Sequence, residues 1–385
     1  MRLGVDIRCL QDKFLTGVGE YAWRTLLALK KIKPSLELAG FANASRGLNL
    51  PPHCDQIMTI ARSHWPNKLK NLAWYCGLGE PLDTSLTRQV GELDACWLPN
   101  PNFARFSGQT PIVITVHDLS FVHFPNFFRR RPRLWYFPAM LKLLGSGLPS
   151  KSKVVAVSNY TADDIIYSFP DLKNKLHVIT PGVGEEFKQT PTDGAITELR
   201  LKYRLPPKFI LSLGTIEPRK NYGLLLKAYQ LILNRQSDYP FDLVIAGGWG
   251  WRYNSLQQIF RHLPASTQAR IHWLGYVAET DKPALYNQAA LFVYPSFYEG
   301  FGIPPLEAMA AGLPVLVSHT SSLAEVVGEA GLLLSPYQPQ LWATMIHDLT
   351  TNPGLTKDFI IKGRQRAEQF TWEKSAQAYY DLFAN

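Results

Sequence analysis

Short apolar segments alternate with helical segments along the whole chain, and this alternation limits the fold more than any other feature of the sequence. The apolar runs, of which 112–116 and 243–246 are typical, have the length and the β-branched content of buried strands. Amphipathic segments such as 21–31 separate them and predict helices. Strands that alternate with helices form parallel sheets with helices on both faces. The expected strands are 3–7, 37–41, 56–60, 94–98, 112–116, 154–158 and 175–179 in the first half, and 209–213, 243–246, 270–274, 290–295 and 314–317 in the second.

The alternation runs through two halves, which the polar and turn-rich segment 185–194 separates. A chain of 385 residues is long enough for two domains with separate hydrophobic cores. We therefore predict an α/β protein with two doubly wound, Rossmann-like domains, the first over residues 1–188 and the second over residues 189–371.

The composition is typical of a soluble globular protein, because 46% of the residues are hydrophobic and 18% are charged. No apolar run is long enough to span a membrane, and the four cysteines lack metal-type or redox-type spacing, which indicates reduced thiols in the cytoplasm. The net charge of +9 is uneven: residues 1–186 carry 22 Lys and Arg against 15 Asp and Glu, and residues 187–385 carry 18 against 16. A basic first half suits an anionic partner, such as a membrane surface, a phospholipid-linked acceptor or nucleic acid.

The segment 297–312 joins a buried strand to a helix through a glycine-rich turn. Gly300 and Gly302 allow a ligand to approach the backbone, and the helix start offers free N–H groups to an anion. Glu299 and Glu307 flank this turn with seven residues between them, and carboxylates accept hydrogen bonds from paired hydroxyls. A carboxylate, a turn that can bind an anion and a second carboxylate follow one another in this segment. This order suits a pyrophosphate that carries a sugar at each end. The alternative is a structural turn in which either glutamate is a solvated cap.

A second anion-binding pattern follows the strand 209–213. Gly214 and Thr215 lead to Arg219 and Lys220, which lie at the start of the next helix. Arg offers a planar fork to a phosphate and Lys a point charge, and one well-aligned contact contributes roughly 1.5–3 kcal/mol. A solvated pair of charges is the alternative interpretation.

Candidate ligand contacts also follow three other strands, at the point where each strand ends. His117 and Asp118 follow a strand of the first half, and Gly248 and Val277 follow two strands of the second half. In doubly wound sheets, residues just past the carboxyl ends of the strands line the ligand crevice. For the first pair, a structural His–Asp cap is the alternative.

Two glycines, Gly17 and Gly19, lie between the first strand and the helix expected over 21–31. A glycine turn at a helix start can face a phosphate or an acceptor. The alternative is a plain tight turn.

Four arginines, Arg129, Arg130, Arg131 and Arg133, are interleaved with aromatic side chains in the segment 121–137. Such a patch suits an anionic bilayer, at about 1 kcal/mol per basic residue near the surface, with the aromatic rings at the headgroup level. It equally suits single-stranded nucleic acid, or a solvated loop whose aromatic rings pack inward. Residues that would extend the same surface are His64, Trp65, Lys68, Lys70 and Trp74.

Taken together, these motifs resemble the retaining glycosyltransferases of family 4, a mannosyltransferase-like bacterial group with the two-domain GT-B fold. The Glu-x7-Glu segment that begins at Glu299 and the Gly-Thr-Ile-Glu-Pro-Arg-Lys-Asn segment that begins at Gly214 carry most of the resemblance. Matches recur from Gly17 to Trp372 and so cover nearly the whole chain. The resemblance implies that the two domains face a cleft, that the first binds the acceptor and the second the donor, and that a C-terminal helix at 372–385 crosses back to the first.

The resemblance also implies a role for each candidate residue. Arg219 and Lys220 would stabilise the charge of the leaving diphosphate, Glu307 would hold the ribose hydroxyls, and Glu299 would hold hydroxyls of the donor sugar. Several relatives carry an arginine where this chain has Thr215, so the two cations would have to carry the phosphate charge. The other implied contacts are His117 and Asp118 to the transferred sugar, and Gly17, Gly19, Gly214, Gly248, Val277, Gly300, Phe301, Gly302 and Ile303 to the donor.

The function that the resemblance implies is retaining, metal-independent transfer of a hexose from a nucleotide sugar to a glycan or lipid-linked acceptor. The motifs look most like those of GDP-mannose users, although UDP-glucose and UDP-N-acetylglucosamine users share most of the pattern. Neither a cofactor nor a metal is expected, since the sequence has no Asp-x-Asp motif. No nucleic-acid partner is expected, and the enzyme would work in the cytoplasm, at the inner face of the membrane. The alternatives are a sugar-nucleotide epimerase and a non-catalytic protein that binds nucleotide sugars or membranes.

Overall fold

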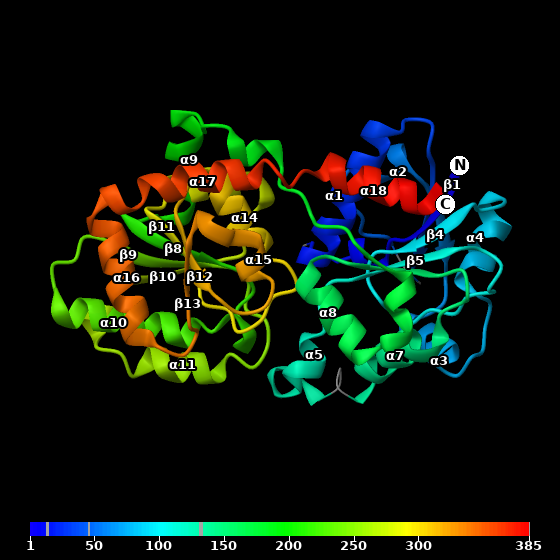
Figure 1. The fold of residues 1–385 in the computed structure, drawn as a ribbon, viewed down its shortest axis with the longest axis horizontal. Helices are drawn as coiled ribbons and strands as arrows, with labels where there is room; N and C mark the ends of the chain where they lie inside the picture. Colours follow the sequence, from blue (N-terminus) through cyan, green and yellow to red (C-terminus); the bar gives the residue numbers. More distant parts are fainter. Residues whose placement is uncertain (13–14, 45–46, 131–133, 385) are drawn as a thin grey trace. The chain divides into compact units, whose positions relative to one another are not determined.

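The computed structural model describes residues 1–12, 15–44, 47–130 and 134–384, and these form two compact units, each built on a parallel sheet (Figure 1). The first unit comprises Met1–His123, Arg130–Gly182 and Trp372–Asn385, and the second comprises Phe124–Arg129 and Val183–Thr371. Among the described residues, no helix is both long enough and apolar enough to cross a lipid bilayer.

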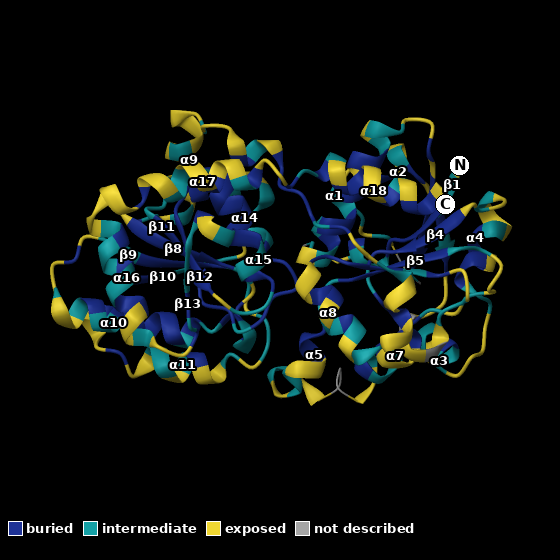
Figure 2. Cartoon of the chain, in the orientation of Figure 1, coloured by how far each residue is buried: buried dark blue, intermediate teal, exposed yellow. Residues whose placement is uncertain are grey.

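The first unit contains a seven-stranded parallel sheet in the order β3-β2-β1-β4-β5-β6-β7. The residues of its central strands are buried on both faces of the sheet, as the continuous apolar runs predict (Figure 2). The strands are β1 (Arg2–Asp6), β2 (Glu37–Asn43), β3 (Thr59–Ser63), β4 (Ala95–Leu98), β5 (Ile112–Val116), β6 (Lys153–Ala156) and β7 (Leu176–Val178). The helices are α1 (Gly17–Ile32), α2 (Cys54–Ile57), α3 (Asn67–Tyr75), α4 (Leu82–Val90), α5 (Ser120–His123), α7 (Tyr136–Lys142), α8 (Asn159–Ser168) and α18 (Trp372–Ala384).

The C-terminal helix α18 packs beside α1 in the first unit, as the resemblance implied (Figure 1). A buried chain of hydrogen bonds fixes it to the sheet. The Tyr379 hydroxyl lies 2.8 Å from the Tyr21 hydroxyl and also contacts Thr115 Oγ1, which accepts a hydrogen bond from Trp97 Nε1 at 3.0 Å. Residues from both ends of the chain therefore complete one core.

The second unit contains a six-stranded parallel sheet in the order β10-β9-β8-β11-β12-β13. The strands are β8 (Phe209–Leu213), β9 (Asp242–Ala246), β10 (Ile271–Gly275), β11 (Leu291–Tyr294), β12 (Val315–Ser318) and β13 (Leu332–Leu334). The helices are α9 (Asp193–Tyr203), α10 (Tyr222–Arg235), α11 (Asn254–Arg261), α12 (Ala265–Gln268), α13 (Lys282–Gln288), α14 (Ile303–Ala310), α15 (Leu323–Val327), α16 (Pro339–Thr351) and α17 (Lys357–Ala367).

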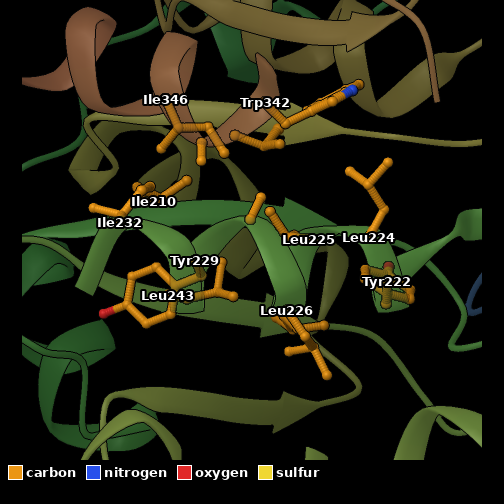
Figure 3. Close-up of a cluster of buried hydrophobic side chains, with 14 of the residues drawn as sticks. Ile210, Tyr222, Leu224, Leu225, Leu226, Tyr229, Ile232, Leu243, Trp342 and Ile346 are labelled. Atoms are coloured by element: carbon orange, nitrogen blue, oxygen red, sulfur yellow. The ribbon is translucent and has the colours of Figure 1, made fainter. Parts of the chain in front are cut away.

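Helices cover both faces of this second sheet. On one face, side chains of α10 and α16 such as Leu225 and Trp342 pack on strand residues that include Ile210 (Figure 3). On the other face, Tyr286 of α13 packs edge-on against Phe292 of β11, at 5.5 Å between ring centroids. Successive strand residues point to opposite faces, so the side chains of one short apolar strand pack into the hydrophobic layers on both sides of the sheet.

The predicted fold class is confirmed, and three local predictions need correction. The strand expected over 56–60 begins later, at Thr59, because the left-handed backbone of His53 turns the chain into the short helix α2. Helix α1 begins at Gly17, earlier than expected, because Thr16 caps it. The edge strand β13 was not predicted from the sequence.

Candidate active site

The loops that follow β8 and β11 meet in the second unit, and these two strands are neighbours in its sheet. From β8 the chain moves outward to β9 and β10, and from β11 it moves the other way to β12 and β13. Ligands of doubly wound folds bind where the strand order reverses in this way. Two hydrogen bonds join the loops: Phe297 N donates to Arg219 O at 2.9 Å, and Asn221 Nδ2 donates to Pro295 O at 3.1 Å.

A buried cluster of charges occupies this point. Glu299 Oε1 accepts a hydrogen bond from Lys220 Nζ, and its Oε2 accepts one from Arg219 Nη1, both at 2.7 Å. Arg219 Nη2 also lies 2.7 Å from Glu217 Oε1, and Lys220 donates to the Tyr294 hydroxyl. The structure therefore brings together three predicted site residues from two loops that are far apart in the sequence.

Sequence analysis missed two members of this cluster, Glu217 and Tyr294. Both are buried. Glu217 lies two residues before Arg219, within the quoted motif, so its charge was visible in the sequence. Tyr294 lies in an apolar strand, and nothing in that pattern shows that its hydroxyl faces a lysine.

The charges of the cluster shift one another's ionisation. Burial alone would raise the pKa of the Glu299 carboxyl, but the charges of Arg219 and Lys220 outweigh this effect and lower the pKa to about 2. Burial lowers the pKa of the Lys220 ammonium, and the Glu299 carboxylate opposes that shift. Glu299 is therefore an anion at neutral pH, held between two cationic side chains.

The glycine turn ends where helix α14 begins. Gly302 is the N-cap residue and has a φ of 121°, in the region that favours glycine. A Cβ atom there would also come within 2.9 Å of Leu323 Cδ2. Ser322 Oγ contacts the carbonyl oxygens of Glu299 and Phe301 at 2.8 and 2.7 Å and so supports the turn. The predicted residues Gly300 and Phe301 lie in this turn and are buried, and Ile303 is the first helical residue.

Glu307 lies inside α14 and is buried, so it is not a solvated cap. Its Oε2 accepts a hydrogen bond from the Tyr286 hydroxyl at 2.8 Å, and Lys282 Nζ lies 3.9 Å from Oε1. A carboxylate oxygen can accept more than one hydrogen bond, so this anchored group can still bind ligand hydroxyls.

The loops after β8, β9 and β10 form a continuous wall. Gly247 N donates to Gly275 O at 2.7 Å, and Ile216 N donates to Gly248 O at 2.9 Å. A Cβ atom on Gly247 would lie 2.0 Å from the Gly214 carbonyl oxygen, so only glycine lets these loops touch. The predicted residues Gly214, Thr215, Gly248 and Val277 lie on these loops, where Thr215 is exposed and Val277 is buried.

The first unit has its own switch point, between β1 and β4, and a cavity of about 240 Å³ lies there. Arg8 and Asp6 form a buried bidentate ion pair in its wall, with N···O distances of 2.8 and 2.6 Å. Sequence analysis missed this cavity, although Asn100 follows a strand in the way that drew attention to other candidates, and Asp6 is the last residue of β1. The lining residues are Asp6, Arg8, Cys9, Asp12, Thr16, Val18, Asn100 and Asn102.

His117 lies at the carboxyl end of β5 in the first unit. Its Nε2 lies 2.7 Å from the Pro99 carbonyl oxygen and therefore carries the proton, which leaves Nδ1 as an acceptor. Burial lowers the pKa of the His117 ring, and the Tyr21 ring meets it edge-on at 4.8 Å between ring centroids. Asp118 Oδ1 instead accepts hydrogen bonds from Ser120 N at 2.9 Å and Ser120 Oγ at 2.6 Å, so this carboxylate holds the turn into α5.

Gly17 and Gly19 form the first turn of α1 and not a separate loop. Thr16 Oγ1 accepts a hydrogen bond from Gly19 N at 3.4 Å, and Gly17 is exposed with open space where a side chain would stand.

Several aromatic rings of the arginine-rich segment pack against other parts of the protein, although Trp135 is exposed. Phe127 O accepts a hydrogen bond from Trp251 Nε1 at 2.8 Å, and the Phe124 ring lies 5.9 Å from the ring of Tyr298, next to Glu299. These contacts explain why Phe124–Arg129 groups with the second unit.

The neighbouring aromatic rings are also covered. Phe121 and Phe137 stack at 4.6 Å between ring centroids and are buried in the first unit. The alternative in which the aromatic rings pack inward holds for these two phenylalanines, because their apolar area is already packed within the protein. Contact of the arginine-rich segment with a bilayer stays a prediction. Arg129 and Arg130 are exposed, whereas Arg131 and Arg133 lie outside the described residues.

Comparisons with known proteins agree with this fold. The model of the glycosyl transferases of group 1 matches residues 197–366, and that of glycosyltransferase family 4 matches residues 94–187. The chain is 31% identical over 370 residues to the O-antigen chain mannosyltransferase B of Escherichia coli, and the alignment covers 93% of each protein. The serotype-specific mannosyltransferase WbdA of Escherichia coli is 33% identical over 234 residues, which are 60% of this chain and 28% of that protein.

Solved structures share the architecture. HepE from Anabaena, in complex with UDP and glucose, has a TM-score of 0.72 at 18% identity, covering 100% of this chain and 99% of that one. WaaG, a glycosyltransferase involved in lipopolysaccharide biosynthesis, has a TM-score of 0.74 at 16% identity and full coverage of both chains. The two Rossmann-like units thus define a protein of the GT-B class. The chain belongs to glycosyltransferase family 4, and it is a glycosyltransferase.

Proposed function

We propose that this protein transfers mannose from GDP-mannose to a glycan acceptor, with retention of configuration and without a metal ion. The observation that carries the proposal is the buried cluster of Glu299, Arg219 and Lys220 at the switch point of the second sheet. Mannose is favoured by the relatives, since both are named mannosyltransferases, and the one that aligns over 93% of the chain is named for an O-antigen chain. The proposal therefore assigns the protein to polysaccharide biosynthesis.

The two cations would bind the donor diphosphate. Glu299 holds both Arg219 and Lys220 within a largely buried site, and Glu217 also holds Arg219, so both cations are positioned before a donor binds. Negative charge grows on the diphosphate as the sugar leaves, and fixed cations in a site poor in water stabilise such charge strongly. This supplies the electrostatic role that a metal ion has in other transferases.

Two carboxylates would position the hydroxyl groups of the donor. Each oxygen of the Glu299 carboxylate can accept more than one hydrogen bond, and Glu299 would accept from hydroxyls of the mannose. Glu307, which Tyr286 orients, would accept from the ribose hydroxyls. Because each carboxylate is anchored by protein groups before the donor arrives, little ordering is needed on binding.

Retention would follow if the acceptor attacks from the face that the diphosphate leaves. A phosphate oxygen would then take the acceptor's proton, while the bond from the sugar to the diphosphate breaks and the new glycosidic bond forms. His117, with Nδ1 as an acceptor, would hold a hydroxyl of the transferred sugar, whereas Asp118 would act by shaping the turn.

The acceptor would bind the first unit at the cavity beside Asp6 and Arg8. Its walls offer carboxylates, amides and a threonine hydroxyl, which suit the hydroxyl groups of a sugar. We also place the reaction in a reducing cytoplasmic compartment, because Cys9, Cys54, Cys76 and Cys96 are all free thiols.

Thermal unfolding with a panel of nucleotides tests the proposal. GDP and GDP-mannose should raise Tm without a metal ion, since a ligand at 100 times its Kd adds about 2.7 kcal/mol of stability. If UDP or UDP-glucose raises Tm and the GDP compounds do not, the proposed donor is wrong, but the enzyme is still a glycosyltransferase. A folded sample that responds to no nucleotide contradicts the proposal.

A further inference from the structure

A buried tyrosine contacts one of the two cations of the candidate site. Tyr294 is the last residue of β11 and is 1% exposed. Its hydroxyl oxygen accepts a hydrogen bond from Lys220 Nζ. A buried hydroxyl group costs free energy unless it has a hydrogen-bond partner, and here the partner is an ammonium group. This hydroxyl has no part in the proposed transfer reaction, so its position beside Lys220 needs an explanation.

The hydrogen bonds of the Lys220 ammonium determine the direction of its remaining donor. An ammonium group has three N–H donors and no acceptor. One N–H of Lys220 points to Glu299 Oε1, which lies 2.7 Å from Nζ, and a second points to the Tyr294 hydroxyl. Within the described part of the chain, these two oxygens are the hydrogen-bond acceptors of Nζ. The third N–H is therefore left for a ligand, and the first two fix its direction.

The rest of the Lys220 side chain is also held in place. It passes the loop after β8, where a Cβ atom on Gly214 would lie 3.4 Å from Lys220 Cε and 3.4 Å from the Tyr222 hydroxyl oxygen. The Tyr222 hydroxyl donates to the Gly214 carbonyl oxygen at 2.8 Å. Because the side chain is packed at this loop, the ammonium group changes its orientation mainly by rotation about the Cε–Nζ bond. The directions of its N–H groups therefore depend on Tyr294 and Glu299.

The ionisable groups near the Lys220 ammonium also control its charge. They come from the loops after β8 and β11, from β11 itself and from α10, and they are Glu217, Arg219, Tyr222, Tyr294 and Glu299. Burial lowers the pKa of the Lys220 ammonium, the Glu299 carboxylate opposes this shift, and the charge of Arg219 adds to it. A hydrogen bond accepted from an ammonium group favours its charged form. The Tyr294 hydroxyl therefore helps to keep Lys220 cationic.

We propose that Tyr294 is a positioning residue, whose hydroxyl holds the Lys220 ammonium so that its third N–H can meet an oxygen of the donor diphosphate. Tyr294 itself would not contact the donor. The inference rests on the proposed role of Lys220 in binding the diphosphate. It does not depend on the nucleobase, because all nucleoside diphosphates carry the same phosphate oxygens. Without the hydroxyl, the ammonium would lose one of its two hydrogen bonds and its fixed orientation, and it would lose its charge at a lower pH.

Tyr294→Phe tests the proposal, because it removes the hydroxyl and keeps the buried ring. Calorimetric titration of the full chain with GDP, and separately with UDP, measures Kd without a need for the acceptor. For the nucleotide that binds the wild type, the variant should have a Kd about tenfold higher at pH 7, as expected when a hydrogen bond to a charged group is lost. Circular dichroism shows whether the variant is folded.

Two further measurements separate positioning from a merely structural role. The affinity should fall as the pH rises through the pKa of Lys220, and this fall should come at a lower pH in Tyr294→Phe. The ratio of the two Kd values should therefore grow from pH 7 to pH 10, and ionisation of the nucleobase cancels in this ratio because it affects both proteins alike. In a Lys220→Ala background, Tyr294→Phe should have no further effect on Kd, since the hydroxyl acts through the ammonium.

Tyr229→Phe is the matched control. Tyr229 lies in the hydrophobic cluster of the second unit (Figure 3) and is 1% exposed. Its hydroxyl donates to the Phe241 carbonyl oxygen at 3.0 Å and makes no contact with the candidate site among the described residues. This variant removes the same kind of buried hydroxyl and should bind the nucleotide as the wild type does.

Three results would overturn the role of Tyr294. Tyr294→Phe could bind the nucleotide as tightly as the wild type, the ratio of Kd values could stay constant with pH, or the loss of affinity could persist in the Lys220→Ala background. Binding of UDP in place of GDP would change the proposed donor and leave the role of Tyr294 intact. A folded wild type that binds neither nucleotide would overturn the proposed function and this inference together.

Discussion

At the scale of single residues, the candidate site depends on one carboxylate, that of Glu299, shared by two cations. Glu299 forms both ion pairs within a largely buried site, so each partner there needs the others. Breaking a buried pair costs more than the pair itself contributes, because an unpaired charge remains in a poorly solvated place. The buried ion pairs that would serve the diphosphate in the proposed function therefore also make the loop structure sensitive to substitution.

Replacing Lys220 by Ala should lower kcat/KM for sugar transfer by about 10²–10³-fold, since one charge that would stabilise the leaving diphosphate is lost. Steady-state kinetics with donor and acceptor measure the effect, with circular dichroism to show that the variant is folded. Lys227→Ala, an exposed change on the helix that follows, should leave the rate unaltered. Equal rates for the wild type and Lys220→Ala would refute the assigned role.

The ionisation of Glu299 predicts how its contribution to stability depends on pH. Its pKa of about 2 lies below the ordinary value of 4.5, so the stabilisation is fully present above about pH 4.5 and is lost as the pH falls toward 2. The shift corresponds to about 3 kcal/mol. Urea unfolding should therefore give a larger free energy of unfolding for the wild type than for Glu299→Gln at pH 7. The difference between the two proteins should become smaller below pH 4. A gap independent of pH would show that charge is not its cause.

At the scale of elements, one glycine sets the path from β11 into α14. Gly302 combines a positive φ with a neighbour that would contact any Cβ atom. The turn therefore needs glycine for two separate reasons, and both act on the loop that holds Glu299.

Gly302→Ala should destabilise the protein by about 1–3 kcal/mol, the typical cost of a non-glycine residue in a strained backbone conformation. Gly194→Ala in α9, where a Cβ atom meets open space, should be neutral or stabilising by up to about 1 kcal/mol. Denaturant unfolding of both variants measures the contrast, and a similar effect at the two positions would contradict the backbone explanation.

At the scale of the whole molecule, neither unit is a continuous piece of chain. The C-terminal helix belongs to the first unit, and Phe124–Arg129 belongs to the second. The Tyr379 hydroxyl, which contacts Tyr21 and Thr115, shows how the end of the chain closes a core that begins at its start.

Tyr379→Phe should cost about 1–3 kcal/mol of stability, because it leaves buried hydroxyl groups without their shared partner. Tyr380→Phe, at the next and partly exposed position, is the matched control and should cost much less. Thermal unfolding of the two variants measures the difference, and equal losses would exclude the buried network as the reason.

Much of the site could be predicted because its parts are local. Glu299, Gly302 and Glu307 lie within one strand–turn–helix segment, so residues that are near one another in the sequence are also near one another in the structure. The partner of the Lys220 ammonium, Tyr294, could not be found in this way, because that contact depends on which strands become neighbours.

The sequence by itself determined the two parallel sheets, because alternating apolar strands and amphipathic helices can bury their surfaces only in layers. It also determined where glycine and proline turn the chain. Only the tertiary structure decided that the phenylalanines of 124–128 pack in the second unit and that α3 turns Trp74 inward and Leu69 outward. The physical reason is that a local pattern shows that a side chain is apolar, whereas long-range packing decides whether protein already covers it.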